Sequence, residues 1–178
     1  MEIVKIILLV ILCIVVLLLI IAAFMRKDVN VTKEIIINKS KQEVFAYVRL
    51  LKNQDNFSKW GSMDSNMKKT YTGTDGTVGF ISAWVGNKKV GEGEQEILKI
   101  NEGNSIDYAL RFIKPFKSNS NAFMTFEDAG NNQTKMQWGF KSRMPYPMNA
   151  MCIFMNMEEM CGKDFQIGLD NLKALLEK

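Results

Sequence analysis

Hydrophobic and polar positions follow two different patterns along the chain. Every residue from Ile6 to Met25 is apolar, whereas the residues that follow mix apolar and polar positions with the periods of strands and helices. At about 1.5 Å per residue in a helix, the first run spans roughly 30 Å, the thickness of a bilayer's hydrocarbon layer. We therefore predict a membrane-spanning helix over residues 6–25 inside an anchor of residues 1–28, followed by one domain over residues 29–178.

The domain is predicted to begin with a strand, two helices and then a meander. Val31 to Ile37 is rich in β-branched residues, and Ser40 with Glu43 three positions later is typical of a capping box that opens a helix ending near Leu51. A short helix is expected over residues 53–60. Six strands are then expected between turns rich in glycine and asparagine, over residues 67–73, 79–85, 90–100, 105–113, 121–127 and 134–142. Such short connections join antiparallel neighbours.

A long helix is predicted to follow Pro147 and to run to the end of the chain. Its apolar face contains Phe165, Leu169 and Leu172. If the helix is continuous, the same face also carries the side chains of Cys161, Glu158, Phe154 and Met151. The predicted fold class is therefore α+β, with one antiparallel sheet wrapped on a long C-terminal helix and preceded by one transmembrane helix.

A helix laid across the concave side of a twisted sheet can leave a cavity between the two layers. Alternating apolar positions on the strands, and six of the twelve methionines lying between Met144 and Met160, supply side chains for its wall. The alternative is that these side chains are solid core. The predicted ligand contacts are Phe80, Trp84, Tyr108, Phe112, Met124, Trp138, Met151, Phe154, Met155 and Glu158.

Glu158 is the sharpest single candidate for chemistry. In a cavity its carboxylate would be desolvated, its pKa would rise, and it could bind a polar headgroup or donate a proton. If the helix kinks or rotates, Glu158 is instead a solvated glutamate beside Glu159. Glu158 and a tyrosine such as Tyr108 are the candidates for an acid and base pair. Arg111 and the glutamates at positions 92, 94 and 96 are expected to face outward.

Composition excludes several function classes. The chain has no histidine, which rules out histidine-based triads, bases and metal ligands. Its three cysteines form no CxxC pattern, so no metal site, redox site or cofactor is indicated. The net charge of +4 includes no clustered basic stretch typical of a nucleic-acid partner. Lys and Arg are concentrated after the apolar run, which favours a cytoplasmic domain, whereas a cleaved signal peptide is the rival interpretation of that run.

The order of elements resembles the helix-grip fold of the START-like, or SRPBCC, superfamily, which includes the birch-allergen type proteins, and within it the bacterial polyketide cyclase/dehydrase branch. The resemblance covers about residues 31–177. It is carried by residues 56–60 (NFSKW), 78–80 (VGF) with Trp84, 90–94 (VGEGE), 134–138 (TKMQW), 162–165 (GKDF) and 168–173 (GLDNLK). It implies a deep apolar cavity under the last helix, used for lipids, sterols, polyketides and other hydrophobic compounds. No catalytic residue is carried over, because no catalytic motif matches.

Three functions remain open from the sequence. The first is a membrane-tethered domain that binds a hydrophobic small molecule or lipid between the sheet and the last helix. The second is a cyclase- or dehydratase-like enzyme acting on such a compound. The third is a scaffold that binds a protein partner through its surface. The first is favoured, because a cavity needs only shape and apolar walls, while catalysis needs converging polar groups.

Overall fold

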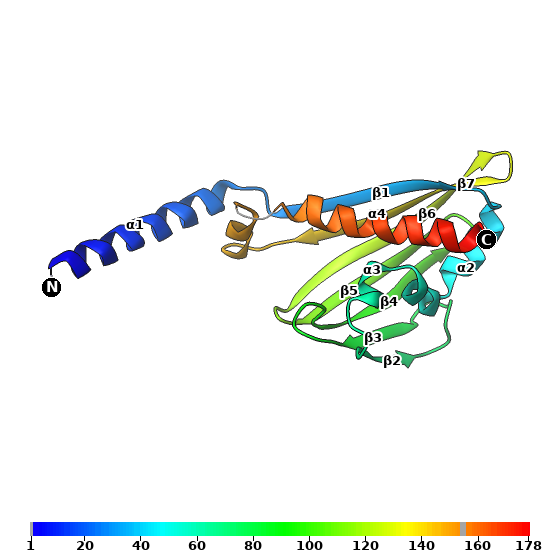
Figure 1. The fold of residues 1–178 in the computed structure, drawn as a ribbon, viewed down its shortest axis with the longest axis horizontal. Helices are drawn as coiled ribbons and strands as arrows, with labels where there is room; N and C mark the ends of the chain where they lie inside the picture. The colour runs from blue at the N-terminus through cyan, green and yellow to red at the C-terminus, as the bar shows by residue number, and fades with distance from the viewer. Residues whose placement is uncertain (1, 154–155) are drawn as a thin grey trace.

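The computed structural model describes residues 2–153 and 156–178. Figure 1 shows helix α1 (Glu2–Phe24) extending away from a body that contains the sheet and the other helices. The apolar side chains of α1 are exposed, and within it only Ala22 is buried. Among the described residues α1 is the one helix long and apolar enough to cross a membrane, a property shared by anchors and by signal sequences near an amino terminus.

The body is built on one antiparallel sheet of seven strands in the order β1-β7-β6-β5-β4-β3-β2. Consecutive strands β2 to β7 are neighbours, and β1 closes the far edge by pairing with β7. The predicted α+β fold, with a meander following the first strand, is therefore confirmed. The strands are β1 (Asp28–Ile37), β2 (Lys68–Thr72), β3 (Ile81–Val85), β4 (Glu92–Asn101), β5 (Ser105–Lys114), β6 (Ser118–Gly130) and β7 (Gln133–Arg143).

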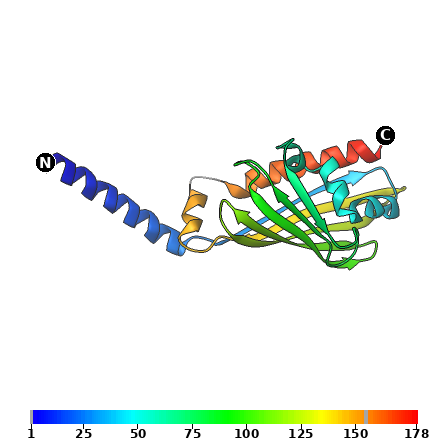
Figure 2. The same ribbon diagram turned by 90° about the horizontal axis from the view of Figure 1, so that it is seen from below.

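The long C-terminal helix and the first helix after β1 lie on one face of the curved sheet, as Figure 2 shows. Helix α4 (Met157–Leu176) packs along β1 and buries Phe165, Leu169 and Leu172 against the sheet. Helix α2 (Lys41–Arg49) buries Val44, Phe45 and Val48 on the same face. These side chains meet the inward-facing residues of the central strands in one continuous core. Burial of this apolar surface is the main term that holds the layers together.

Two predicted helices are divided in the structure. The expected helix over residues 53–60 is a 3-10 helix, η1 (Leu51–Asn56), followed by the short helix α3 (Lys59–Ser62). The carboxylate of Asp75 accepts hydrogen bonds from the backbone N–H groups of Leu51 (2.7 Å) and Lys52 (3.3 Å), which fixes the start of η1. The helix expected directly after Pro147 is a 3-10 helix, η2 (Met148–Ile153), and α4 begins only after its N-cap, Asn156.

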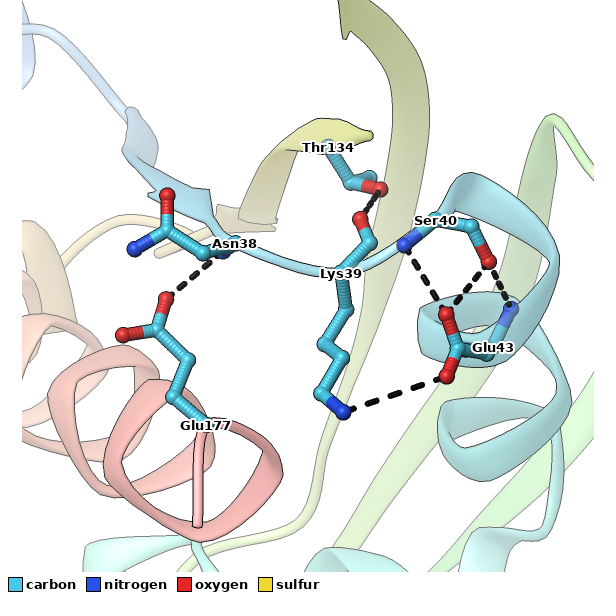
Figure 3. A network of polar contacts seen from close by, with 6 residues as sticks. All are labelled: Asn38, Lys39, Ser40, Glu43, Thr134 and Glu177. Carbon is cyan, nitrogen blue, oxygen red and sulfur yellow. Dashed lines mark hydrogen bonds and ion pairs between the residues drawn. The ribbon is translucent and has the colours of Figure 1, made fainter. Parts of the chain in front are cut away.

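A polar network closes the end of the body that lies away from α1 (Figure 3). The predicted capping box is confirmed: Ser40 and Glu43 exchange side-chain and backbone hydrogen bonds at the start of α2. Next to it, the carboxylate of Glu177 accepts a hydrogen bond of 2.6 Å from the backbone N–H of Asn38, and this bond lowers the pKa of Glu177. The end of α4 is thus tied to the corner between β1 and α2.

Two glycines of α4 give a test of how closely this helix approaches the sheet. A Cβ at Gly168 would lie 2.7 Å from the ring of Trp138, whereas a Cβ at Gly162 would lie 2.9 Å from Cε of the flexible Lys33 side chain. We expect Gly168→Ala to lower the free energy of unfolding, because overpacking costs about 1–3 kcal/mol and outweighs the helix propensity of alanine. Gly162→Ala should instead raise it by up to about 1 kcal/mol, since Lys33 can move aside. Chemical denaturation of both variants measures the difference, and equal effects would contradict this packing.

Candidate functional site

The inner face of the sheet changes from fully buried to half-buried side chains toward the end nearer α1, which we call the open end. Tyr108 and Met124 are buried, whereas Leu110 and Phe112, which follow Tyr108 on β5, are only partly covered. On β6 and β1 the inward side chains stay buried up to this end, as Ala122 and Val29 show. Strand register places Trp84 and Phe112 on the same face, because both pair with Gly93. The half-buried residues of the open end are Trp60, Trp84, Leu110, Phe112 and Phe140.

Gly93 allows two aromatic rings to meet on this face. A Cβ at Gly93 would lie 2.7 Å from the ring of Trp84, so any larger residue would displace that ring. The Trp84 ring instead meets Phe112 edge to face, with 5.9 Å between the ring centroids. Ring pairs in this arrangement are a common way to build a firm apolar surface. Two of the predicted ligand contacts therefore lie side by side at the open end.

The space beneath the middle of α4 is filled by aromatic side chains. Trp138 lies between Phe165 of α4 and Phe57, with centroid distances of 4.8 Å and 5.7 Å. Trp60 contacts both Trp138 (6.2 Å) and Phe165 (5.2 Å). Solid packing of this kind is the ordinary state of a protein interior. Trp138 is therefore a core residue, in agreement with the alternative interpretation given above. Apolar space for a ligand has to be sought at the open end instead.

Polar bonds hold the segment that carries Trp60 against α4. Lys59 Nζ pairs with the carboxylate of Asp164 at 2.5 Å, and Asn171 donates a hydrogen bond of 3.1 Å to the carbonyl oxygen of Phe57. These contacts place Trp60 over the inner face from the side opposite the strands. The ligand contacts predicted from the sequence did not include Trp60, whereas Leu110 and Phe140 were expected in the cavity wall without being named among those contacts. The alternation along β5 and β7 contained the signal for Leu110 and Phe140, while no pattern along the chain determined the direction of Trp60.

Tyr108 is buried in the core, with no charged partner at its hydroxyl. The hydroxyl lies 3.8 Å from the sulfur of Met124, and burial raises the pKa of Tyr108 well above its ordinary value. A tyrosine in this state is a neutral core residue. Its position argues against the proton-transfer role that was considered for it.

The buried hydroxyl predicts a specific effect of alkaline pH. An unfolded tyrosine ionises near pH 10.0, whereas folded Tyr108 keeps its proton, so the unfolded state binds fewer protons above that pH. The free energy of unfolding should therefore fall as pH rises above about 10. For Tyr108→Phe the free energy of unfolding should fall less steeply over the same pH range. At neutral pH the free energy of unfolding of Tyr108→Phe should differ from that of the native chain by less than about 1 kcal/mol, because the hydroxyl has only a weak sulfur acceptor. Melting temperatures of both proteins from pH 9 to pH 11 test this, and parallel curves would contradict it.

Of the two alternatives for Glu158, the structure agrees with the solvated glutamate and not with a carboxylate buried in a cavity. It is exposed in the first turn of α4, and its carboxylate accepts a hydrogen bond of 3.3 Å from the backbone N–H of Asn30 at the start of β1. The helical phase did point this side chain toward the sheet, but toward its edge strand rather than its concave centre. Glu158 and Tyr108 are thus held by different surroundings, and the structure does not bring them together as an acid and base pair.

The remaining predicted contacts are scattered. Phe80 is buried and stacks on Tyr71 with 6.0 Å between the ring centroids. Met151 is exposed on η2, which also shows that it does not continue the apolar face of α4. Phe154 and Met155 lie outside the described residues. The expected outward direction of Arg111 is confirmed, because it forms ion pairs with Glu94 and Glu96 on the convex face.

Two open hollows lie on the surface of the described residues; the first is lined mainly by polar side chains, and the second by both polar and apolar ones. One, of about 420 Å³, is lined by residues from Arg26 to Asn30, from the start of β6 and from the end of β7. The other, of about 530 Å³, lies beside it and is lined by residues such as Arg111, Phe112 and Lys117. No residue of α4 lines either hollow. Within residues 2–153 and 156–178, no three acidic or cysteine side chains converge to hold a metal ion.

Comparisons with known proteins agree with this architecture. Residues 28–177 match the family model described as polyketide cyclase / dehydrase and lipid transport. No curated protein sequence matches the chain.

Solved structures give the same fold at low sequence identity. Norcoclaurine synthase from Thalictrum flavum, solved with dopamine and hydroxybenzaldehyde, is 9% identical with a TM-score of 0.64, covering 84% of this chain and 86% of that one. A Chromobacterium violaceum protein is 13% identical with a TM-score of 0.59, covering 84% and 97%. A Nitrosospira multiformis protein is 18% identical with a TM-score of 0.55, covering 82% and 94%.

At these identities the structures support the fold alone, whereas the family model covers nearly all of the domain. The helix-grip arrangement of α4 on a seven-stranded antiparallel sheet and the match over residues 28–177 lead to one assignment. The chain belongs to the polyketide cyclase / dehydrase and lipid transport family of the SRPBCC superfamily.

Proposed function

We propose that this chain is a single-pass membrane protein whose domain binds a hydrophobic small molecule or lipid at the open end of the helix-grip. The half-buried apolar surface on the inner face of the sheet is the observation that carries this proposal. Trp84, Leu110 and Phe112 continue the buried core toward α1 but keep part of their surface exposed to solvent. Ligand binding in the family is in keeping with such a surface.

Burial of apolar area would drive this binding. Each square ångström of apolar surface removed from water contributes about 25 cal/mol. An apolar compound that covers only part of the aromatic rings at the open end therefore still gains useful affinity. Trp84 and Phe112 form one wall of this surface. The half-buried Trp60 packs on Phe165 of α4. The only polar requirement is that the polar end of the ligand remain in water, which the open side provides.

The proposed anchor brings the domain to the source of such ligands. Only Met25, Arg26 and Lys27 separate α1 from β1, so the open end stays close to any membrane that α1 crosses. Tethering of this kind raises the local concentration of membrane-derived compounds. The excess of Lys and Arg after α1 favours a cytoplasmic domain.

Native mass spectrometry of the full chain, extracted in mild detergent, tests the proposal. Leu110→Trp fills the inner face at the open end, and Leu98→Trp adds the same ring to an exposed position on β4. The native chain and Leu98→Trp should retain a hydrophobic compound that organic extraction identifies. Leu110→Trp should retain at least tenfold less, because one indole ring occupies much of the apolar surface that the ligand would cover.

Two results would contradict the proposal. One is a native chain that carries no small molecule under conditions that keep it folded. The other is equal retention by Leu110→Trp and Leu98→Trp, which would place the compound elsewhere. A copurifying protein without any extractable compound would favour the scaffold instead.

A further inference from the structure

We propose that the end of the domain beside α1 docks on an anionic bilayer surface, with lipid headgroups seated in the two open hollows described above. This inference rests on the proposed anchoring by α1. The surface concerned, which we call the basal rim, consists of residues 25–30, residues 85–91 between β3 and β4, residues 113–121 around the turn from β5 to β6, and residues 141–147 after β7.

Strand register places these segments at one end of the sheet. Asp28 pairs with Arg143, Ser120 pairs with Ser142, and Phe112 pairs with Ser118 just before the turn between β5 and β6. Glu92, directly after the turn between β3 and β4, pairs with Lys114. α1 leaves the body at this same end, as Figure 1 shows. A bilayer crossed by α1 would therefore be the nearest large surface to the basal rim.

A side-chain contact holds the end of α1 to this part of the body. Asn149 of η2 is fully buried and donates a hydrogen bond of 2.6 Å to the carbonyl oxygen of Ala22. The bond joins the last turn of α1 to the segment that follows β7. The basal rim is thus kept near the point where α1 would enter the bilayer, rather than being connected to it by a long flexible linker.

The basal rim exposes large apolar side chains that the fold leaves without a partner. Their exposed fractions are 52% for Val85, 41% for Ile113, 58% for Phe116 and 48% for Tyr146. These residues come from three separate connections that meet at one end of the sheet. Side chains of this kind insert into the interface between headgroups and acyl chains, and tyrosine is enriched there.

The charges of the basal rim are complementary to an anionic surface. Among the described residues, Arg26, Lys117, Lys141 and Arg143 form no ion pair. The nearby acidic side chains are largely engaged by the protein: Glu92 pairs with Lys114 at 2.7 Å, and Glu94 pairs with Arg111 at 2.8 Å. Asp28 is the remaining carboxylate that lines a hollow. The excess charge facing the membrane is therefore positive.

These cations line the two hollows, and the hollows have a shape that suits a lipid headgroup. Both are lined by Arg143 and Asn119, so they adjoin at the end of β7 and the start of β6. The first adds Arg26 and Lys141, and the second adds Lys117. Guanidinium and ammonium groups around a polar hollow are the donors that bind phosphate oxygens. A phospholipid phosphate beside the inserted Phe116 would satisfy both features at once.

Hydrogen exchange of the full chain in nanodiscs tests the docking. We compare discs of phosphatidylcholine alone with discs that contain 30% phosphatidylglycerol, using millisecond labelling of the peptide over residues 113–119. On the anionic discs exchange should slow by about fivefold or more, the effect expected when even one cation approaches an anionic surface. The turn at residues 101–104, at the other end of the sheet, should exchange equally on both discs. Added salt at 0.5 M should remove the difference.

Paired charge reversals provide the control. Lys117→Glu with Arg143→Glu should abolish the protection on anionic discs, whereas Lys99→Glu with Lys178→Glu, at positions outside the basal rim, should preserve it. The docking is overturned if the amides of residues 113–119 exchange at the same rate on both kinds of disc. This holds even if residues 2–24 are protected, a result that would leave the anchor in place. Unprotected amides over residues 2–24 would refute the anchor itself, and the docking with it.

Discussion

Replacement of Trp138 by alanine is expected to lower the free energy of unfolding by about 3–5 kcal/mol, the range for removing a large aromatic side chain from a core. Trp138 is 2% exposed and lies between Phe57 and Phe165, so its ring joins the sheet to α4. It also fills the space that Gly168 leaves on the helix. Without the indole, a void remains beneath α4 that the surrounding rings can only partly fill.

Urea denaturation of the full chain in mild detergent, followed by circular dichroism, measures this loss. Trp138→Phe should recover a large part of the stability, because a smaller ring still bridges the two layers. Ile113→Ala, at an exposed position, should change it by less than about 0.5 kcal/mol. A loss below about 1.5 kcal/mol for Trp138→Ala would mean that α4 is held mainly by other contacts.

The second large effect is expected for Gly91→Ala, directly before the start of β4. Gly91 has a φ of +73°, a conformation that costs a residue with a Cβ about 1–2 kcal/mol. A Cβ there would also collide with the backbone carbonyl oxygen of Lys114 on the neighbouring strand. Since backbone atoms cannot move aside like a flexible side chain, a further cost of about 1–3 kcal/mol follows.

Gly103→Ala separates these two causes. Gly103 has a φ of +70°, but a Cβ there would meet nothing within 4 Å. We expect Gly103→Ala to show the conformational cost alone and Gly91→Ala to exceed it by at least about 1 kcal/mol in the same denaturation experiment. Equal losses would show that β5 can yield at Lys114 and that the collision is relieved.

The sequence was sufficient to predict the fold because its local signals agree with one another. The capping box of Ser40 and Glu43, the glycine and asparagine turns and the alternation along each strand all favour the observed order of elements. The break before α4 was missed, since helical periodicity alone did not separate residues 148–153 from the helix that starts at Met157. That error explains why Met151 was placed on the apolar face of the last helix.

The candidate site was less accessible from the sequence. Alternation identifies which side chains of one strand share a face, but the register through Gly93, which it does not give, is what brings Trp84 beside Phe112. Alternation also does not say how deep a side chain lies, so the half-buried Trp84 and the fully buried Trp138 looked alike. Depth depends on what α3 and α4 cover, which is a property of tertiary packing. Glu158 shows the same limit. The helical phase predicted that its side chain points toward the sheet, but not that it meets the edge strand β1 rather than the concave centre.

The location of a ligand at the open end is tested most directly by photo-crosslinking in the full chain. A benzophenone amino acid replaces Phe112 on the inner face or, as the control, Leu98 on an exposed face of β4. After irradiation of cells or membranes, mass spectrometry of the purified chain identifies covalent adducts. We predict a small hydrophobic adduct at position 112 and none at position 98. An unmodified position 112, or the same adducts at both positions, would contradict the proposed site.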